Sequence, residues 1–192
     1  LVHPKVLRAM TTPLLGYMDP AFFALMDQIK GLLQQVFETR NALTLPVSGT
    51  GSAGMEATIA NIIESGDPIL VCVNGFFGLR LAEMARRYGA HVTIIQAPWG
   101  QVFAPTDIEK ALKTNPAKVV AIVHAETSTG VLQPLAEIAE VVHRNQALLL
   151  VDAVTSLGGV PVSVDKVGID LAYSGSQKCL SCPPGLAPLT IS

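Results

Sequence analysis

A single lysine at the end of an apolar segment offers the clearest chemistry in this sequence. The segment from Ile169 to Tyr173 runs directly into Ser174-Gly175-Ser176-Gln177, after which the chain presents Lys178. Small residues let the backbone approach a ligand closely, and a lysine held in a partly dry loop after a strand is what a Schiff-base nucleophile requires. The alternative is an ordinary surface lysine, because most lysines are exposed.

A second residue, Asp152, ends the most continuous aliphatic run of the sequence, residues 147–151. Such a run predicts a strand buried on both faces of a parallel sheet. The carboxylate at its end would lie among apolar groups, where a charge is costly unless a cation or hydrogen bonds meet it. A metal, a helix N-terminus or a protonated ring nitrogen could do so. Pyridoxal phosphate (PLP) supplies the ring nitrogen, and its enzymes combine a lysine Schiff base with an acid at that nitrogen.

A glycine-rich loop, residues 48–54, follows the first expected strand and opens a helix. Its backbone N–H groups and the positive end of the helix dipole would form an anion cradle, with the hydroxyls of Thr50 and Ser52 beside it. The loop also matches the dinucleotide pattern G-x-G-x-x-G, but that pattern requires an acid about 20 residues later, where the next strand ends at Asn74. A phosphate site, a dinucleotide site and a plain glycine turn therefore remain open.

Further loops carry side chains of less specific meaning. Phe77, between glycines, could stack on a planar ligand or simply pack in the core. Hydroxyls after His124 could bind a ring substituent, whereas His124 itself continues an apolar strand and is typical of a core histidine. Cys179 and Cys182 form one C-x-x-C without a second pair or a nearby histidine, which is weak support for metal or redox chemistry. The histidines do not cluster with cysteines or acids, so we predict no metal site.

The elements that must position these loops alternate regularly from Leu43 onward. The expected strands end near Val47, Val73, Ile95, Val123 and Val151, and the expected helices end near Ile63, Tyr88, Leu112 and His143. This alternation predicts an α/β three-layer sandwich with a mainly parallel sheet flanked by helices, and ligand sites beyond the carboxyl ends of its strands. Before it, Asp19-Pro20 and a helical apolar spacing up to Phe37 predict a long amphipathic helix. We therefore divide the chain into a segment 1–38 and a domain 39–192.

Composition narrows the class of function. The chain has 192 residues, 49% of them hydrophobic, and a net charge of −2. It therefore has enough apolar residues for a large core, and it lacks the excess of positive charge that is typical of nucleic-acid binding. No apolar run approaches the roughly 18 to 20 residues that span a bilayer, and we expect no membrane partner. Three cysteines, an odd number, argue against a disulfide framework and suit a reducing compartment. We expect the cytoplasm, with the peroxisome or mitochondrion as alternatives for a eukaryotic source.

Together these motifs resemble fold-type I PLP enzymes, specifically class V aminotransferases of the alanine/serine–glyoxylate type. The segments that carry the resemblance occur in one order along the chain: SGTGSAGMEA, NGFFG, AETSTGVLQPL, LLLVDAVTSLGG and YSGSQK. The resemblance implies the large cofactor domain of a PLP transferase. It also implies transfer of an amino group from a small amino acid, alanine or serine, to a 2-oxo acid such as glyoxylate, in a homodimer.

The resemblance also assigns roles to individual residues. Lys178 would form the Schiff base and Asp152 would pair with the pyridinium nitrogen. The remaining cofactor contacts would be Thr50, Gly51, Ser52 and Gln177 at the phosphate, Phe77 stacked on the ring and Thr127 near the 3-hydroxyl. Relatives sometimes have tryptophan at position 77. They also continue into a small C-terminal domain with an arginine for the substrate carboxylate, which this sequence lacks, so we expect the isolated chain to be inactive.

Two alternatives stand beside this interpretation. The first is a PLP enzyme of the cysteine desulfurase type, although that subgroup usually has histidine before its lysine, where this chain has Gln177. The second is a nucleotide-binding or non-catalytic module, for which the glycine-rich loop is the only support.

Overall fold

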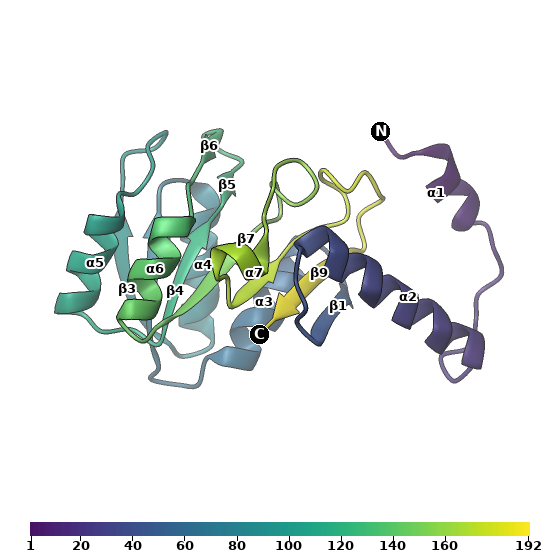
Figure 1. The fold of residues 1–192 in the computed structure, drawn as a ribbon, viewed down its shortest axis with the longest axis horizontal. Helices are drawn as coiled ribbons and strands as arrows, with labels where there is room; N and C mark the ends of the chain where they lie inside the picture. Colours follow the sequence, from purple (N-terminus) through teal and green to yellow (C-terminus); the bar gives the residue numbers. More distant parts are fainter.

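The computed structural model describes residues 1–192 and shows a three-layer α/β sandwich (Figure 1). Its central sheet has seven strands, in the spatial order β1 (Leu43–Ser48), β9 (Leu186–Ile191), β8 (Leu171–Tyr173), β7 (Leu148–Asp152), β4 (Val119–Val123), β2 (Pro68–Val73) and β3 (His91–Gln96). The pairs among β8, β7, β4, β2 and β3 are parallel, and β9 is antiparallel to both of its neighbours. The predicted fold class, with a mainly parallel sheet, is confirmed.

Helices cover both faces of the sheet. The helices α3 (Gly51–Ile62) and α4 (Phe76–Arg87) pack on one face, and the other face is covered by α5 (Pro105–Thr114), α6 (Ala136–Arg144), α7 (Val164–Val167) and the end of α2 (Pro20–Phe37). Successive residues of a strand enter opposite cores: Leu70 joins the α5 and α6 side, and Val71 joins the α3 and α4 side. Burial on both faces explains why the central strands are apolar without interruption.

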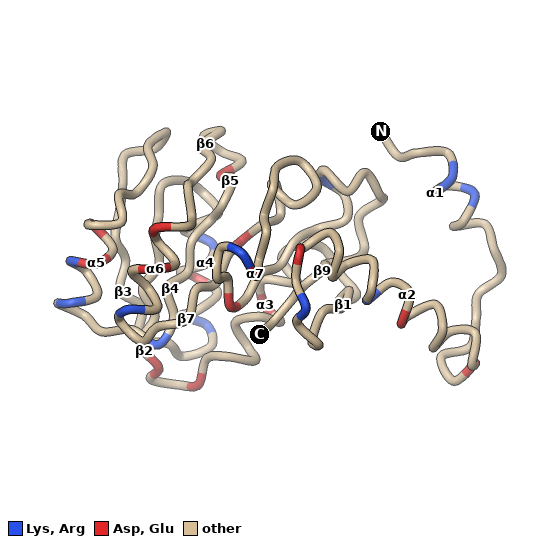
Figure 2. The backbone as a smooth tube through the Cα atoms, viewed as in Figure 1, with Lys and Arg blue, Asp and Glu red and all other residues tan.

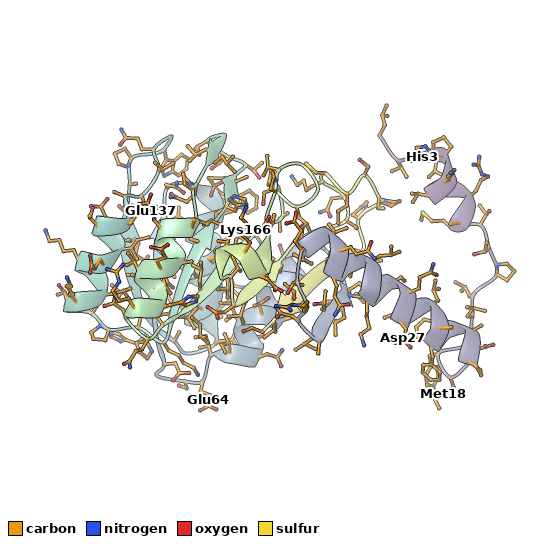
Figure 3. All side chains as sticks on the ribbon, viewed as in Figure 1. His3, Met18, Asp27, Glu64, Glu137 and Lys166 are labelled. Carbon is orange, nitrogen blue, oxygen red and sulfur yellow. The ribbon has the colours of Figure 1, made fainter.

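The long amphipathic helix forms as its sequence predicts. Asp19 caps α2 by accepting the N–H of Ala21 at 2.8 Å, and Pro20 occupies the first helical position. The helix ends at Glu38, whose φ of 52° is left-handed. Only Phe37 of this helix is buried, and α1 (Pro4–Ala9) with the first half of α2 projects away from the sheet (Figure 1). Figure 3 places Met18 and Asp27 on this projecting part.

Several elements were not among those expected from the sequence. They are α1, α7, β9 and the two-stranded hairpin of β5 (Ala125–Glu126) and β6 (Val131–Leu132). The strand β9 lies inside the sheet although it contains Pro188, a residue that usually marks a strand as an edge or a bulge. Pro188 stands opposite Pro46 in the register of β1 and β9. Gly49 donates its N–H to Gly185 O at 2.8 Å, and hydrogen-bonded pairs alternate along an antiparallel ladder, so Pro46 and Pro188 form a pair that needs no N–H donor between β1 and β9.

Charged residues are spread over the molecule rather than gathered on one side. Figure 2 shows lysines, arginines and acids interspersed on the helices and on the connections at both ends of the sheet. No helix combines the length and apolar content that a transmembrane span requires.

We predict that Leu149→Ala lowers the free energy of unfolding by about 2–5 kcal/mol, because Leu149 is 0% exposed in β7 and truncation leaves a cavity. Urea unfolding followed by circular dichroism measures the change. The matched control is Leu132→Ala in the hairpin, where the leucine is 48% exposed and the expected change is within about 0.5 kcal/mol. Equal effects of the two substitutions would contradict the placement of β7 in the core.

Candidate active site

A cavity of about 200 Å³ lies at the carboxyl edge of the sheet, where the strands lead into loops. It is lined by Thr50, Gly51, Ser52, Met55, Phe77, Val123, Ala125, Thr127, Asp152, Val154, Thr155, Tyr173, Gln177 and Lys178. Every residue predicted for the site from the sequence is among them. The structure therefore brings together side chains that are up to 128 residues apart along the chain, from Thr50 to Lys178.

Asp152 is the buried acid of this cavity. Its side chain ends β7, the residue is 3% exposed, and its two oxygens accept the Tyr173 hydroxyl at 2.7 Å and the N–H of Val154 at 2.9 Å. Burial raises the pKa of Asp152 to about 6, although both hydrogen bonds act in the opposite direction. The nearby Glu126 raises this pKa further and Lys178 lowers it. The carboxylate is therefore poised to bind a cation in the cavity.

Tyr173 is the donor that holds Asp152, and we assigned it no role from the sequence. The tyrosine ends β8 directly opposite Asp152 in the parallel register, and it is 0% exposed. Burial, followed by the charge of Asp152, raises the pKa of Tyr173 well above its ordinary value, so the phenol stays a neutral donor. The signal available in the sequence was that two strands each end in a polar side chain, but their adjacency was not known.

Lys178 is held at the cavity by a loop fastened through small residues. Ser174 donates from its backbone N–H to Pro188 O at 2.7 Å and from its hydroxyl to Ala153 O at 3.0 Å. Ser176 donates from its hydroxyl to Pro183 O at 2.6 Å. The loop backbone is thus buried while the Lys178 side chain is exposed. This differs from the partly dry position that we expected, because the small residues face inward and the lysine occupies the open side.

The N-terminus of α3 forms the opposite end of the cavity. The N–H groups of Gly51 and Ser52 point from the first turn of the helix and have no hydrogen-bond acceptor within the protein, because Thr50 caps the helix without a side-chain bond. A Cβ on Gly51 would lie 2.8 Å from Val154 Cγ2, so this approach requires glycine. Arg80 donates to the hydroxyl of Ser52 at 3.4 Å and adds positive charge nearby.

Gln177 reaches this cradle from the lysine loop. Its Oε1 is buried without a hydrogen-bond partner, and a Cβ on Gly175 would lie 2.8 Å from that oxygen and 3.5 Å from the nitrogen of Gly51. The loop before Lys178 and the start of α3 therefore approach each other closely. Free amides, a side-chain amide and a positive helix end make this part of the cavity suited to an anion such as phosphate.

Phe77 and Thr127 lie on two further walls. Phe77 is in the first turn of α4, with its ring packed edge-on against Phe76 at 5.5 Å between ring centroids. The hydroxyls of Thr127 and Thr155 are 2.6 Å apart. Thr155 is a cavity residue that we did not single out from the sequence. A planar ligand between these walls would meet an aromatic ring and a pair of hydroxyls.

Other residues considered from the sequence lie outside this cavity. His124 is 7% exposed, as a core histidine would be, yet its Nδ1 has no hydrogen-bond partner, and burial lowers its pKa. Cys179 and Cys182 are free thiols, and each donates to a backbone carbonyl, Thr155 O at 3.3 Å and Leu180 O at 3.4 Å.

The chain matches the family model described as aminotransferase class-V over residues 17–192. It is 47% identical over 189 residues to the (S)-ureidoglycine–glyoxylate transaminase of Bacillus subtilis, covering 98% of this chain and 45% of that protein. It is 46% identical over 190 residues to alanine–glyoxylate aminotransferase of Rattus norvegicus, with 98% and 46% covered. The crystal structure of alanine–glyoxylate aminotransferase from Nostoc sp. superposes with a TM-score of 0.98 at 55% identity, covering 100% of this chain and 51% of that one. The chain thus spans about half the length of these relatives.

We predict that Asp152 makes stability depend on pH. Because the folded state raises the pKa of Asp152 to about 6 from 3.8, its stabilising contribution is complete below about pH 4 and is lost as the pH rises through 6. The free energy of unfolding of the wild type relative to Asp152→Asn should therefore fall by roughly 3 kcal/mol between pH 4 and 7. Urea unfolding at a series of pH values measures this difference.

Asp165 provides a control in which the pH dependence of stability should have the opposite sign. A hydrogen bond from Thr39 lowers the pKa of Asp165, so stability relative to Asp165→Asn should rise with pH over the acidic range. If the difference in free energy of unfolding between the wild type and Asp152→Asn stays constant with pH, then the burial of Asp152 does not disfavour its charge.

Proposed function

This chain belongs to the class-V aminotransferase family, and we propose that it forms the cofactor-binding part of an enzyme that transfers an amino group to glyoxylate. The donor would be a small amino acid, alanine or serine. The observation that carries the proposal is the convergence of Lys178, Asp152 and the N-terminus of α3 on one cavity. The names of the relatives support amino transfer over the desulfurase and nucleotide-binding alternatives.

The residues of the cavity fit PLP, on which this family generally depends. PLP presents an aldehyde, a ring nitrogen and a phosphate at three different places, and the cavity offers a partner for each. Asp152, with its pKa raised to about 6 by burial, gains from a protonated ring nitrogen. The free amides of Gly51 and Ser52, with the buried amide of Gln177, suit the phosphate. Lys178 carries the amine that reacts with an aldehyde.

Each side chain then has a definite task in the reaction. PLP, when bound, supplies an electron sink for the charge that develops at the substrate α-carbon. Asp152 would keep the ring nitrogen protonated, and Tyr173 holds Asp152 in place through its hydrogen bond. Lys178 Nζ, whose side chain lines the cavity, would accept the proton from the substrate α-carbon as a general base. Phe77 and Thr127, which line the same cavity, would hold the ring by an aromatic contact and a hydroxyl.

We further propose that residues 39–192 act as the cofactor domain, and that residues 1–38 contact a second subunit in a homodimer. The support is the exposure of apolar side chains along α2, where Phe23 is 49% and Leu32 is 52% exposed. A reducing compartment such as the cytoplasm agrees with the three free cysteines.

The test of the proposal is covalent labelling. We expect the chain incubated with PLP and reduced with borohydride to carry the label on Lys178, and Lys178→Ala to lose it while retaining noncovalent PLP binding, because the phosphate and ring contacts remain. Peptide mapping by mass spectrometry locates the label. Lys166→Ala serves as control, since Lys166 is an exposed lysine on α7 (Figure 3) and does not line the cavity. A label that persists in Lys178→Ala would place the reactive amine elsewhere.

Replacement of Asp152 tests the assignment of the acid. In the complete enzyme that contains this chain, we expect Asp152→Asn to lower kcat for alanine and glyoxylate roughly 10²- to 10³-fold, the range for removing one preorganised electrostatic contact. The amide still accepts from Tyr173 but no longer favours a protonated ring nitrogen. Steady-state pyruvate formation measures the loss, and near-normal turnover would show that Asp152 has another partner.

A further inference from the structure

We propose that Glu126 is a positioning residue that fixes Phe77 in the cofactor cavity by capping helix α4 from a distant part of the chain. This inference rests on the proposed function, because it assigns to Phe77 the contact with the ring of PLP. Glu126 is the last residue of β5 and immediately precedes Thr127, which lines the same cavity.

The carboxylate of Glu126 is buried and fully occupied by donors. The residue is 1% exposed, and Oε2 accepts the N–H of Phe77 at 3.0 Å and that of Gly78 at 3.3 Å. Oε1 accepts the N–H of Ser128 at 3.0 Å and its hydroxyl at 2.8 Å. Burying a carboxylate costs free energy unless hydrogen bonds or the positive end of a helix stabilise its charge. Glu126 has both kinds of stabilisation.

The same contacts cap the start of α4. Its N-cap residue is Gly75, which has no side chain to bond the free amides of the first turn. Glu126 binds the amides of Phe77 and Gly78, and the hydroxyl oxygen of Ser128 accepts the N–H of Phe76 at 2.9 Å. The first turn is therefore held by residues about fifty positions later in the sequence rather than by the usual local cap.

Gly75 shows how closely the two segments meet. Its φ of 179° is extended backbone that any residue can adopt, so conformation does not require glycine here. The lack of space requires glycine instead, because a Cβ on Gly75 would overlap the Glu126 side chain and lie 2.7 Å from Ser128 Oγ. The absence of a side chain at position 75 lets Glu126 reach the helix.

Only the first turn of α4 depends on this cap. Farther along the helix, Leu81, Ala82 and Ala85 are buried in the core with α3. Loss of the cap would therefore leave the helix docked and loosen the turn that carries Phe77. Glu126 would thus act on the cofactor through the orientation of the ring, and not by contact with it.

The substitution Glu126→Gln weakens the cap with little change of shape, because it removes the negative charge and leaves one acceptor oxygen where the carboxylate has two. Both carboxylate oxygens accept backbone N–H groups, so either orientation of the glutamine amide turns its NH₂ toward a donor. We expect the dissociation constant for PLP to rise roughly three- to tenfold, the range for losing one aromatic stacking contact. In apo protein, hydrogen exchange at the amides of 76–78 should accelerate. Ser128→Ala removes a smaller part of the same cap and should also raise the PLP dissociation constant and accelerate exchange at 76–78.

A double-mutant cycle with Phe77→Ala separates positioning from general destabilisation. If Glu126 acts through Phe77, Glu126→Gln has no further effect on the PLP dissociation constant once Phe77 is alanine. The matched control is Glu137→Gln, an exposed glutamate in the first turn of α6 (Figure 3), which should leave PLP binding unchanged.

Two results would overturn the inference while the proposed function stands: PLP binding unchanged by Glu126→Gln, or the same loss of binding in the Phe77→Ala background. Absence of PLP binding by the wild type would instead overturn the proposed function, and the positioning role with it. Unchanged exchange at 76–78 in Glu126→Gln would refute the cap itself, whatever the cofactor.

Discussion

The burial of a carboxylate at the end of a central strand is the constraint on which the rest of the site depends. Asp152 lies between two neighbouring strands and is 3% exposed, so its charge must be met by groups that the fold supplies. Tyr173 and Val154 provide one hydrogen bond each, and the pKa nevertheless remains raised to about 6. The fold stabilises this acid only in part, which leaves it able to gain from a cation in the cavity.

The two buried acids of this region meet that constraint in different ways. Glu126 receives four hydrogen bonds and faces the N-terminus of α4, so its donors are supplied within the protein. Asp152 receives two and lines the cavity. The number and source of the donors thus separate an acid that organises the backbone from one suited to bind a ligand. Residue type alone does not make this distinction.

Close approach of backbone segments is the second condition for the site. Gly51 packs against Val154, and Gly175 lies near both Gln177 and the nitrogen of Gly51, so three loops meet where side chains are absent. A Cβ at Gly51 would lie 2.8 Å from Val154 Cγ2, and a Cβ at Gly175 would lie 2.8 Å from Gln177 Oε1, so a side chain at either position would disturb its neighbour. The glycines of these loops therefore let the backbone segments around the cavity approach one another closely.

The sequence by itself determined most of the strands and helices of the sandwich and the strand ends that line the cavity. The aliphatic run before Asp152 identified a doubly buried strand, and Asp19 with Pro20 identified the start of α2, because both signals are local. The order of strands, the inclusion of β9 with Pro188, and the adjacency of Tyr173 to Asp152 were decided only by the tertiary structure. The tertiary structure also decided that Glu126 caps α4, since Glu126 is 48 to 49 residues away from the amides it binds. The physical reason is that hydrogen bonds and burial between distant segments depend on which strands become neighbours, and periodicity along one strand carries no information about its neighbour.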